Sequence, residues 1–168
     1  VGGVDADTFT LGVPTFSGSI AGGGGSDTVA AANGTNSWQV TGANTGTLNT
    51  TTTFSGITNL SGGSVADTFT LATDITTFNG SIAGGGGTDT LHATNGSNAW
   101  QTTGTNSGTL NATTAFSGIT NLAGGSGADT ITLGVSTYNG SITGGGGIDT
   151  LAASNGANMW QSTGSNSG

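Results

Sequence analysis

An internal repeat of about 60 residues constrains this chain more than any other feature. Its most distinctive residue recurs at this interval, as Trp38, Trp100 and Trp160. A chain with such a repeat builds one small unit many times, and each unit buries its apolar face only against its neighbours. We therefore expect one continuous array over residues 1–168, cut from a longer chain, with sequence repeats at about 7–66, 67–128 and 129–168, the last one partial.

A shorter period of about 20 residues lies inside the long one. Glycine-led segments begin at Gly2, Gly22, Gly42, Gly62, Gly84, Gly104, Gly124, Gly144 and Gly164. The step from Gly62 to Gly84 is longer than the others because of two extra positions near Thr73 and Asp74, which predict a turn there. Each long repeat is thus predicted to contain three similar units, which we call rungs A, B and C.

Alternating apolar and polar residues predict short strands within each rung. Segments such as 8–11 and 17–20 have the two-residue period of half-buried strands, and turn formers such as Val13-Pro14 and Asn33-Gly34 separate them. Because one rung cannot bury its own apolar face, equivalent strands must stack at a spacing of about 4.8 Å. The sequence predicts an all-β fold, a β-solenoid (parallel β-helix or β-roll) with rungs of about 20 residues, three to a repeat.

The charge composition excludes several classes of partner and chemistry. The chain has no Lys or Arg and eight acidic residues, all Asp, which give it a formal charge of −8. Without basic side chains it cannot neutralise the phosphates of a nucleic acid, and no apolar stretch is long enough for insertion into a membrane. With no Cys, no Glu and a single His in no catalytic motif, we predict that the protein is not an enzyme.

Four of the eight acidic residues lie in glycine-rich loops of the form G-G-x-G-x-D, and the loops before Asp7 and Asp67 fit this form less well because Asp5 and Val65 replace the glycine. Stacked rungs would bring pairs of carboxylates within several Å of one another, and the chain offers no cation to compensate their charge. A bound Ca²⁺ is one answer, because it takes carboxylate and carbonyl oxygens. The other is that each Asp accepts hydrogen bonds from backbone amides of its own loop while its charge faces solvent.

These loops resemble the calcium-binding nonapeptide of the repeats-in-toxin family. The segments that carry the resemblance are 22–29, 84–91, 124–131 and 144–151. In that family calcium lies between loops on adjacent turns of a β-roll. The resemblance implies metal sites at three pairs of residues: Asp7 with Asp27, Asp67 with Asp89, and Asp129 with Asp149. The chain departs from the family in having only one such loop per rung, and rung C, at Gly42 to Thr47, has no acid there.

The segments Asn98 to Gln101, Gly108 to Asn111, Ile119 to Leu122 and Gly124 to Thr130 together resemble the long repeats of giant bacterial surface proteins, the filamentous-haemagglutinin-like and repeats-in-toxin adhesins. The resemblance implies a secreted protein at the cell surface or in an extracellular, biofilm-type matrix. We expect a structural shaft that self-associates into fibres. The alternative is a calcium-dependent adhesive module that binds a glycan or another surface ligand, with ice binding a weaker alternative.

Four further features have simple interpretations. The three Trp side chains are expected in the core, each N–H with a partner, rather than on a sugar-stacking surface. His92 is expected to face outward alone. The Thr-x-Thr pairs of rung A, such as Thr8 with Thr10, suggest ice binding, but Ala30, His92 and Asn49 interrupt the array. Matches to the N-glycosylation motif, including Asn49 and Asn79, are expected by chance in a Thr-rich chain.

Overall fold

Alternation of apolar and polar side chains produces short strands throughout the chain. In the computed structural model, which describes residues 1–72, 78–135 and 137–153, β4 (Ser37–Gly42) shows the pattern most clearly, with Trp38 and Val40 buried and Ser37 and Gln39 exposed. No helix occurs among the described residues, so none of them forms a helix that could cross a membrane. The predicted all-β class is confirmed.

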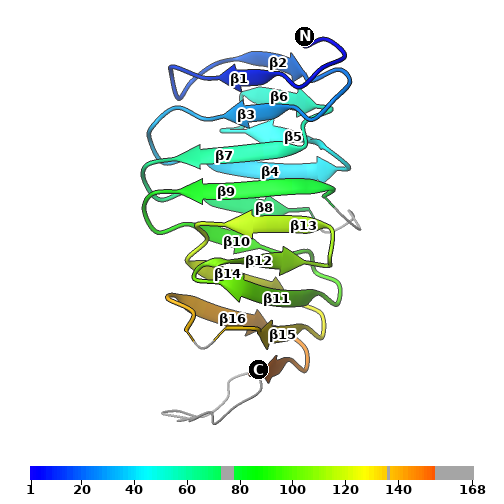
Figure 1. Cartoon of the computed structure of the whole chain (residues 1–168), viewed down its shortest axis with the longest axis vertical. Coiled ribbons are helices and arrows are strands. Elements are labelled where there is room, and N and C mark those ends of the chain that lie inside the picture. Colours follow the sequence, from blue (N-terminus) through cyan, green and yellow to red (C-terminus); the bar gives the residue numbers. More distant parts are fainter. Residues whose placement is uncertain (73–77, 136, 154–168) are drawn as a thin grey trace.

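The strands form two mixed sheets and lie across the long axis of the molecule, one above another (Figure 1). Sheet A has nine strands, in the spatial order β1 (Thr8–Thr10), β3 (Thr28–Ala30), β7 (Asn59–Gly63), β9 (Gly80–Gly85), β13 (Thr114–Ser117), β12 (Ser107–Leu110), β11 (Ala99–Gly104), β15 (Thr130–Leu133) and β17 (Thr150–Ala152). Sheet B has eight strands, in the order β16 (Ser141–Gly145), β14 (Asn121–Gly125), β10 (Thr90–His92), β8 (Thr68–Leu71), β4, β5 (Thr45–Leu48), β6 (Thr52–Ser55) and β2 (Gly18–Ala21).

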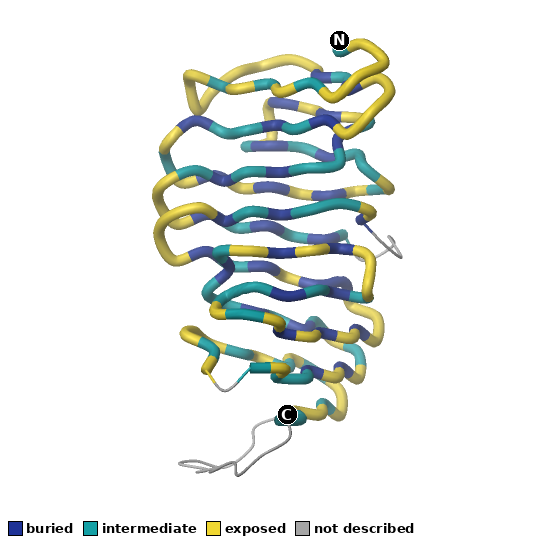
Figure 2. The backbone as a smooth tube through the Cα atoms, viewed as in Figure 1, coloured by how far each residue is buried: buried dark blue, intermediate teal, exposed yellow. Residues whose placement is uncertain are grey.

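Both sheets bury their apolar side chains in one shared core. Figure 2 shows buried positions recurring along the strands, while the loops that join them are exposed. Trp38 lies fully buried, stacked on Phe69 with ring centroids 5.7 Å apart and edge-on to Phe54 at 6.0 Å. Trp100 makes the equivalent edge contact with Phe116 at 5.9 Å. Such pairs stabilise a core beyond the area they bury.

The strands of rungs A and B pair in parallel at the predicted interval. Thr8 is opposite Thr28 across β1 and β3, and Thr130 is opposite Thr150 across β15 and β17, each separated by the same interval as Gly2 and Gly22. Across β8 and β10 Thr68 is opposite Thr90, the longer interval that also separates Gly62 from Gly84. The shorter period therefore has a direct structural basis in these rungs. The predicted turn at Thr73 and Asp74 and the third Trp, Trp160, lie outside the described residues.

Rung C differs from the expectation of three equal rungs. Its glycine-led segment is the turn of a hairpin, so that β5 runs antiparallel to β4 and β6 on either side, as β12 does to β11 and β13. Asn44 and Asn106 occupy these turns with φ of 58° and 56°, a left-handed conformation that Asn tolerates better than most residues. Because the chain doubles back here, β7 skips the hairpin and pairs with β3, which places Asn59 opposite Thr28.

The hairpin gives each complete repeat seven strands, and seven strands cannot be shared equally between two sheets. The first repeat places β1, β3 and β7 in sheet A and its other four strands in sheet B, whereas the second places β8, β10 and β14 in sheet B and its other four in sheet A. Equivalent strands of consecutive repeats therefore lie in opposite sheets. This is the arrangement that a half-turn about the long axis would produce.

Candidate functional site, a ladder of buried carboxylates

Each candidate Asp lies where a glycine-rich loop enters a strand. Four of these side chains are almost completely buried: Asp27 and Asp89 have 0% of their surface exposed, and Asp67 and Asp129 have 1%. Asp7 and Asp149 are partly exposed. The prediction that the charges face solvent is therefore wrong for the four buried residues, because the next layer of the stack covers them.

The three predicted pairs lie on neighbouring strands, and one type of hydrogen bond links each pair. The backbone N–H of Asp67 donates to Asp89 Oδ1 at 2.8 Å. In the same way Asp7 N–H donates to Asp27 Oδ1 at 2.8 Å, and Asp129 N–H donates to Asp149 Oδ1 at 3.0 Å. The carboxylates of Asp27, Asp89 and Asp149 thus each accept from the layer beside them. Only at Asp7, among the described Asp residues, does the structure show a bond from the residue's own loop, where Gly3 N–H donates to Oδ2 at 2.7 Å.

Two Asn residues that the sequence reasoning missed extend this ladder. Asn36 N–H donates to Asp67 Oδ1 at 2.7 Å, and Asn98 N–H donates to Asp129 Oδ1 at the same distance. The buried Asn36 side chain also donates to the carbonyl oxygens of Gly34 and Gly62, which ties two loops together. The signal that would have revealed both residues is their spacing, which equals the interval between Trp38 and Trp100.

The second oxygen of each buried carboxylate has no hydrogen-bond partner. This holds for Oδ2 of Asp27, Asp67, Asp89 and Asp129. Each Oδ2 instead lies against the first glycine of its own loop, so closely that a Cβ on Gly62, for example, would overlap Asp67 Oδ2. The first glycine of the loop is therefore required for space, since only a residue without a side chain admits the carboxylate.

The environment of the central pair opposes ionisation. Burial raises the pKa of Asp67, hydrogen bonds from Asn36 partly offset this, and the charge of Asp89 raises it further. Burial likewise raises the pKa of Asp89, and the bond from Asp67 N–H lowers it. The pair is thus two like charges in a poorly solvated place. Within the described part of the chain, no three His or Asp side chains converge in a way that could hold a metal ion.

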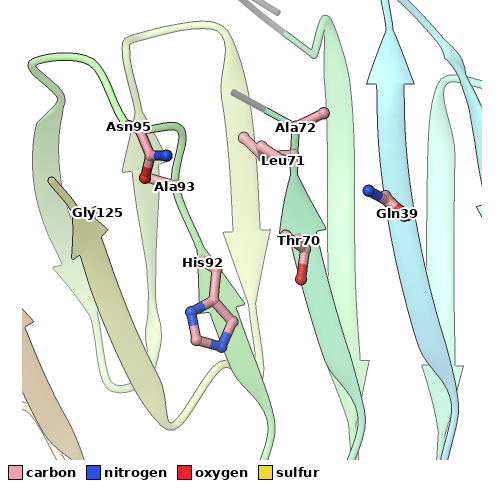
Figure 3. Close-up of a pocket in the computed structure, with 8 residues that line it drawn as sticks. All are labelled: Gln39, Thr70, Leu71, Ala72, His92, Ala93, Asn95 and Gly125. Carbon is pink, nitrogen blue, oxygen red and sulfur yellow. The ribbon is translucent and has the colours of Figure 1, made fainter. Parts of the chain in front are cut away.

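A second candidate site is an open groove on the outer face of sheet B (Figure 3). It has a volume of about 430 Å³ and is lined by Gln39, Thr70, Leu71, Ala72, His92, Ala93, Asn95 and Gly125. Gln39, Thr70 and His92 are direct neighbours on β4, β8 and β10. His92 is exposed, as predicted. The groove offers hydroxyl, amide and imidazole groups for hydrogen bonding and contains no carboxylate among its described residues.

The buried Trp side chains and the interrupted Thr rows decide two other predictions. Trp38 and Trp100 lie in the core, as expected, so neither offers a sugar-stacking surface. Their Nε1 atoms nevertheless have no hydrogen-bond partner, which contradicts the expectation that each N–H would find one. On the outer faces Thr10 lies beside Ala30, and Thr70 lies beside His92, so the Thr array is interrupted as predicted.

No family model, no curated protein and no solved structure matches this chain. Its function must therefore be argued from its own geometry.

We predict that Gly22→Ala destabilises the protein while Gly24→Ala, in the same loop, does not. A Cβ at Gly22 would overlap both Asp27 Oδ2 and the carbonyl oxygen of Gly56, whereas the atom nearest to a Cβ at Gly24 is 3.5 Å away. The expected loss for Gly22→Ala is about 1–3 kcal/mol in the free energy of unfolding, measured with urea. Gly24→Ala is the control, because both variants replace a glycine with alanine and so affect the unfolded chain equally. Equal losses in the two variants would contradict the steric role of Gly22.

We also predict that Asp67 and Asp89 make the protein more stable in acid. Their pKa values lie above the ordinary value of 3.8, so around and above that pH the folded chain binds more protons than the unfolded chain. The free energy of unfolding then falls as the pH rises through the raised pKa values. The stabilisation is fully present only below pH 3.8, the ordinary pKa of Asp. Urea titrations between acidic and neutral pH should show this slope, and Asp67→Asn with Asp89→Asn should reduce it. A slope unchanged in the double variant would count against the assignment.

Proposed function

We propose that this chain is a segment of a β-solenoid shaft in a secreted bacterial fibre or adhesin, located at the cell surface or in an extracellular matrix. The observation that carries the proposal is the stacking of strands in register along one axis. The parallel partners come from successive rungs in β1 with β3 and in β15 with β17. In β2 with β6 and in β9 with β13, one partner is the last of three strands joined in antiparallel fashion. Such stacking can be continued by further repeats without a change of fold. The length of the rod then scales with the number of repeats.

The chemistry of the chain supports a passive structural role. Nearly all large apolar side chains of the central strands are buried in one core, and the buried Asp side chains recur with the repeat instead of gathering at one point. The absence of Lys and Arg removes every cleavage site for trypsin-like proteases. Both properties suit a fibre that works outside the cell.

The shaft proposal predicts the axial rise of a rod made from complete repeats in tandem. Seven strands shared between two sheets advance the axis by half that number of strand spacings, about 17 Å per repeat, and the same face should return after two repeats, about 34 Å. Three equal rungs per repeat would give only about 14 Å. Helical reconstruction from electron micrographs of a tandem array should therefore give the longer values. Globular particles, or the shorter rise of three equal rungs, would refute this arrangement.

A second candidate function, calcium-dependent adhesion, is favoured by the unpartnered Oδ2 atoms. At Gly62 the position of an added Cβ would be close to both Asp67 Oδ2 and, at 2.6 Å, the carbonyl oxygen of Gly84. Carboxylate and carbonyl oxygens are the ligands that Ca²⁺ takes. Asp67 and Asp89 would hold the ion together with loop carbonyls, and the ion would supply the positive charge that the chain lacks. In this loop geometry, however, that position is only one bond length from the Gly62 Cα, so the loop would have to move to admit an ion.

A calcium titration separates the two candidates. A passive shaft should have the same unfolding temperature in Ca²⁺ and in chelator. A calcium-dependent module should gain stability with rising Ca²⁺, by about 2.7 kcal/mol at 100 times the dissociation constant, and Asp67→Asn with Asp89→Asn should remove most of the gain. A gain that survives in the double variant would exclude this pair as the site.

A further inference from the structure

The outer faces of both sheets, over the described residues, carry no Asp, Glu, Lys or Arg side chain. Outward positions on sheet B form the row Ser19, Thr53, Thr47, Gln39, Thr70, His92, Ala123 and Thr143. The corresponding row on sheet A is Thr8, Thr28, Asn59, Ser81, Ala115, Thr109, Gln101, Thr132 and Ala152. The carboxylates of the described residues all lie in the loops that precede strands. The faces are thus neutral while the loops carry the negative charge.

The exchange of sheets between repeats makes the two faces alike. Thr47, Gln39 and Thr70 lie side by side on sheet B. Their equivalents one repeat later, Thr109, Gln101 and Thr132, lie side by side in the same order on sheet A. A partner surface that binds one face therefore finds the same residue types in the same order on the other face.

These observations favour a second copy of the chain as the partner of each face. Soluble proteins spread charges of both signs over their surfaces, and these described rows contain no Asp, Glu, Lys or Arg. Covering hydroxyl and amide groups requires only that their hydrogen bonds be replaced, whereas covering a charge carries a much larger desolvation penalty. Because both faces carry the same elements, one mode of contact serves on either side of the molecule.

We propose that copies of this chain associate laterally, face to face, through the outer rows of sheets A and B, so that shafts bundle into layers. The proposal rests on the proposed structural function, since it explains how single shafts would form a thicker fibre. The contact is centred on Thr47, Gln39 and Thr70 on sheet B and on their equivalents on sheet A. The side chain of His92 stands beside the first of these patches (Figure 3).

Charges placed on one face or on both test the proposal. Sedimentation velocity should show that the average mass of the unmodified chain grows with concentration beyond two copies. Thr47→Glu with Thr70→Glu blocks sheet B, so assembly should stop at pairs, twice the chain mass of 15.9 kDa. Adding Thr109→Glu and Thr132→Glu blocks sheet A as well and should leave single chains. All four positions are partly exposed, and circular dichroism checks that each variant is folded.

A matched control adds the same charge away from the faces. Ser64→Glu with Ser97→Glu changes two exposed loop residues and should leave assembly as in the unmodified chain. The proposal is overturned if the unmodified chain stays single at all concentrations, if the four-site variant still assembles, or if the loop variant dissociates as readily as the variant of sheet B. Electron micrographs of tandem repeats separate this failure from that of the shaft, because unbundled single rods would leave the shaft proposal intact.

Discussion

In-register pairing of short strands is the constraint on which the rest of this structure depends. A strand of only three residues, such as β1 or β10, buries too little apolar surface to be stable alone. It is held by neighbouring strands with the same alternation, as where Phe69 lies between Trp38 and Leu91 in one column. The stack, rather than any single unit, is therefore the cooperative element of the fold.

The corners of the stack are fixed by glycine and aspartate acting together. Each buried Asp of the central layers accepts a hydrogen bond from the next layer with one oxygen and presses the other against the first glycine of its loop. The arrangement joins neighbouring layers at the first glycine of the loop, where the chain has no side chain that could pack between them. Its consequence is a line of carboxylates with little solvation, and this burial raises the pKa of Asp67 and of Asp89.

Polarity differs between the loops, the core and the outer faces of the sheets. Over the described residues, negative charge is confined to the loops, large apolar side chains lie mainly in the interior, and neutral hydroxyl and amide groups dominate the two outer faces. Because each of these features recurs with the repeat, they are spread along the stack of strands.

The sequence by itself determined the class of the fold, the alternation of the strands and the regular steps of rungs A and B, because side-chain period and glycine spacing are local properties. It also placed the Asp pairs on neighbouring strands. It did not reveal the hairpin of rung C, the role of Asn36 and Asn98, or the burial of the carboxylates. The tertiary structure decided these, because left-handed turns at Asn44 and again at Asn49 and Thr50 make the strand count per repeat odd. An odd count sends each repeat's strands to the opposite sheet and so sets which layer covers which corner.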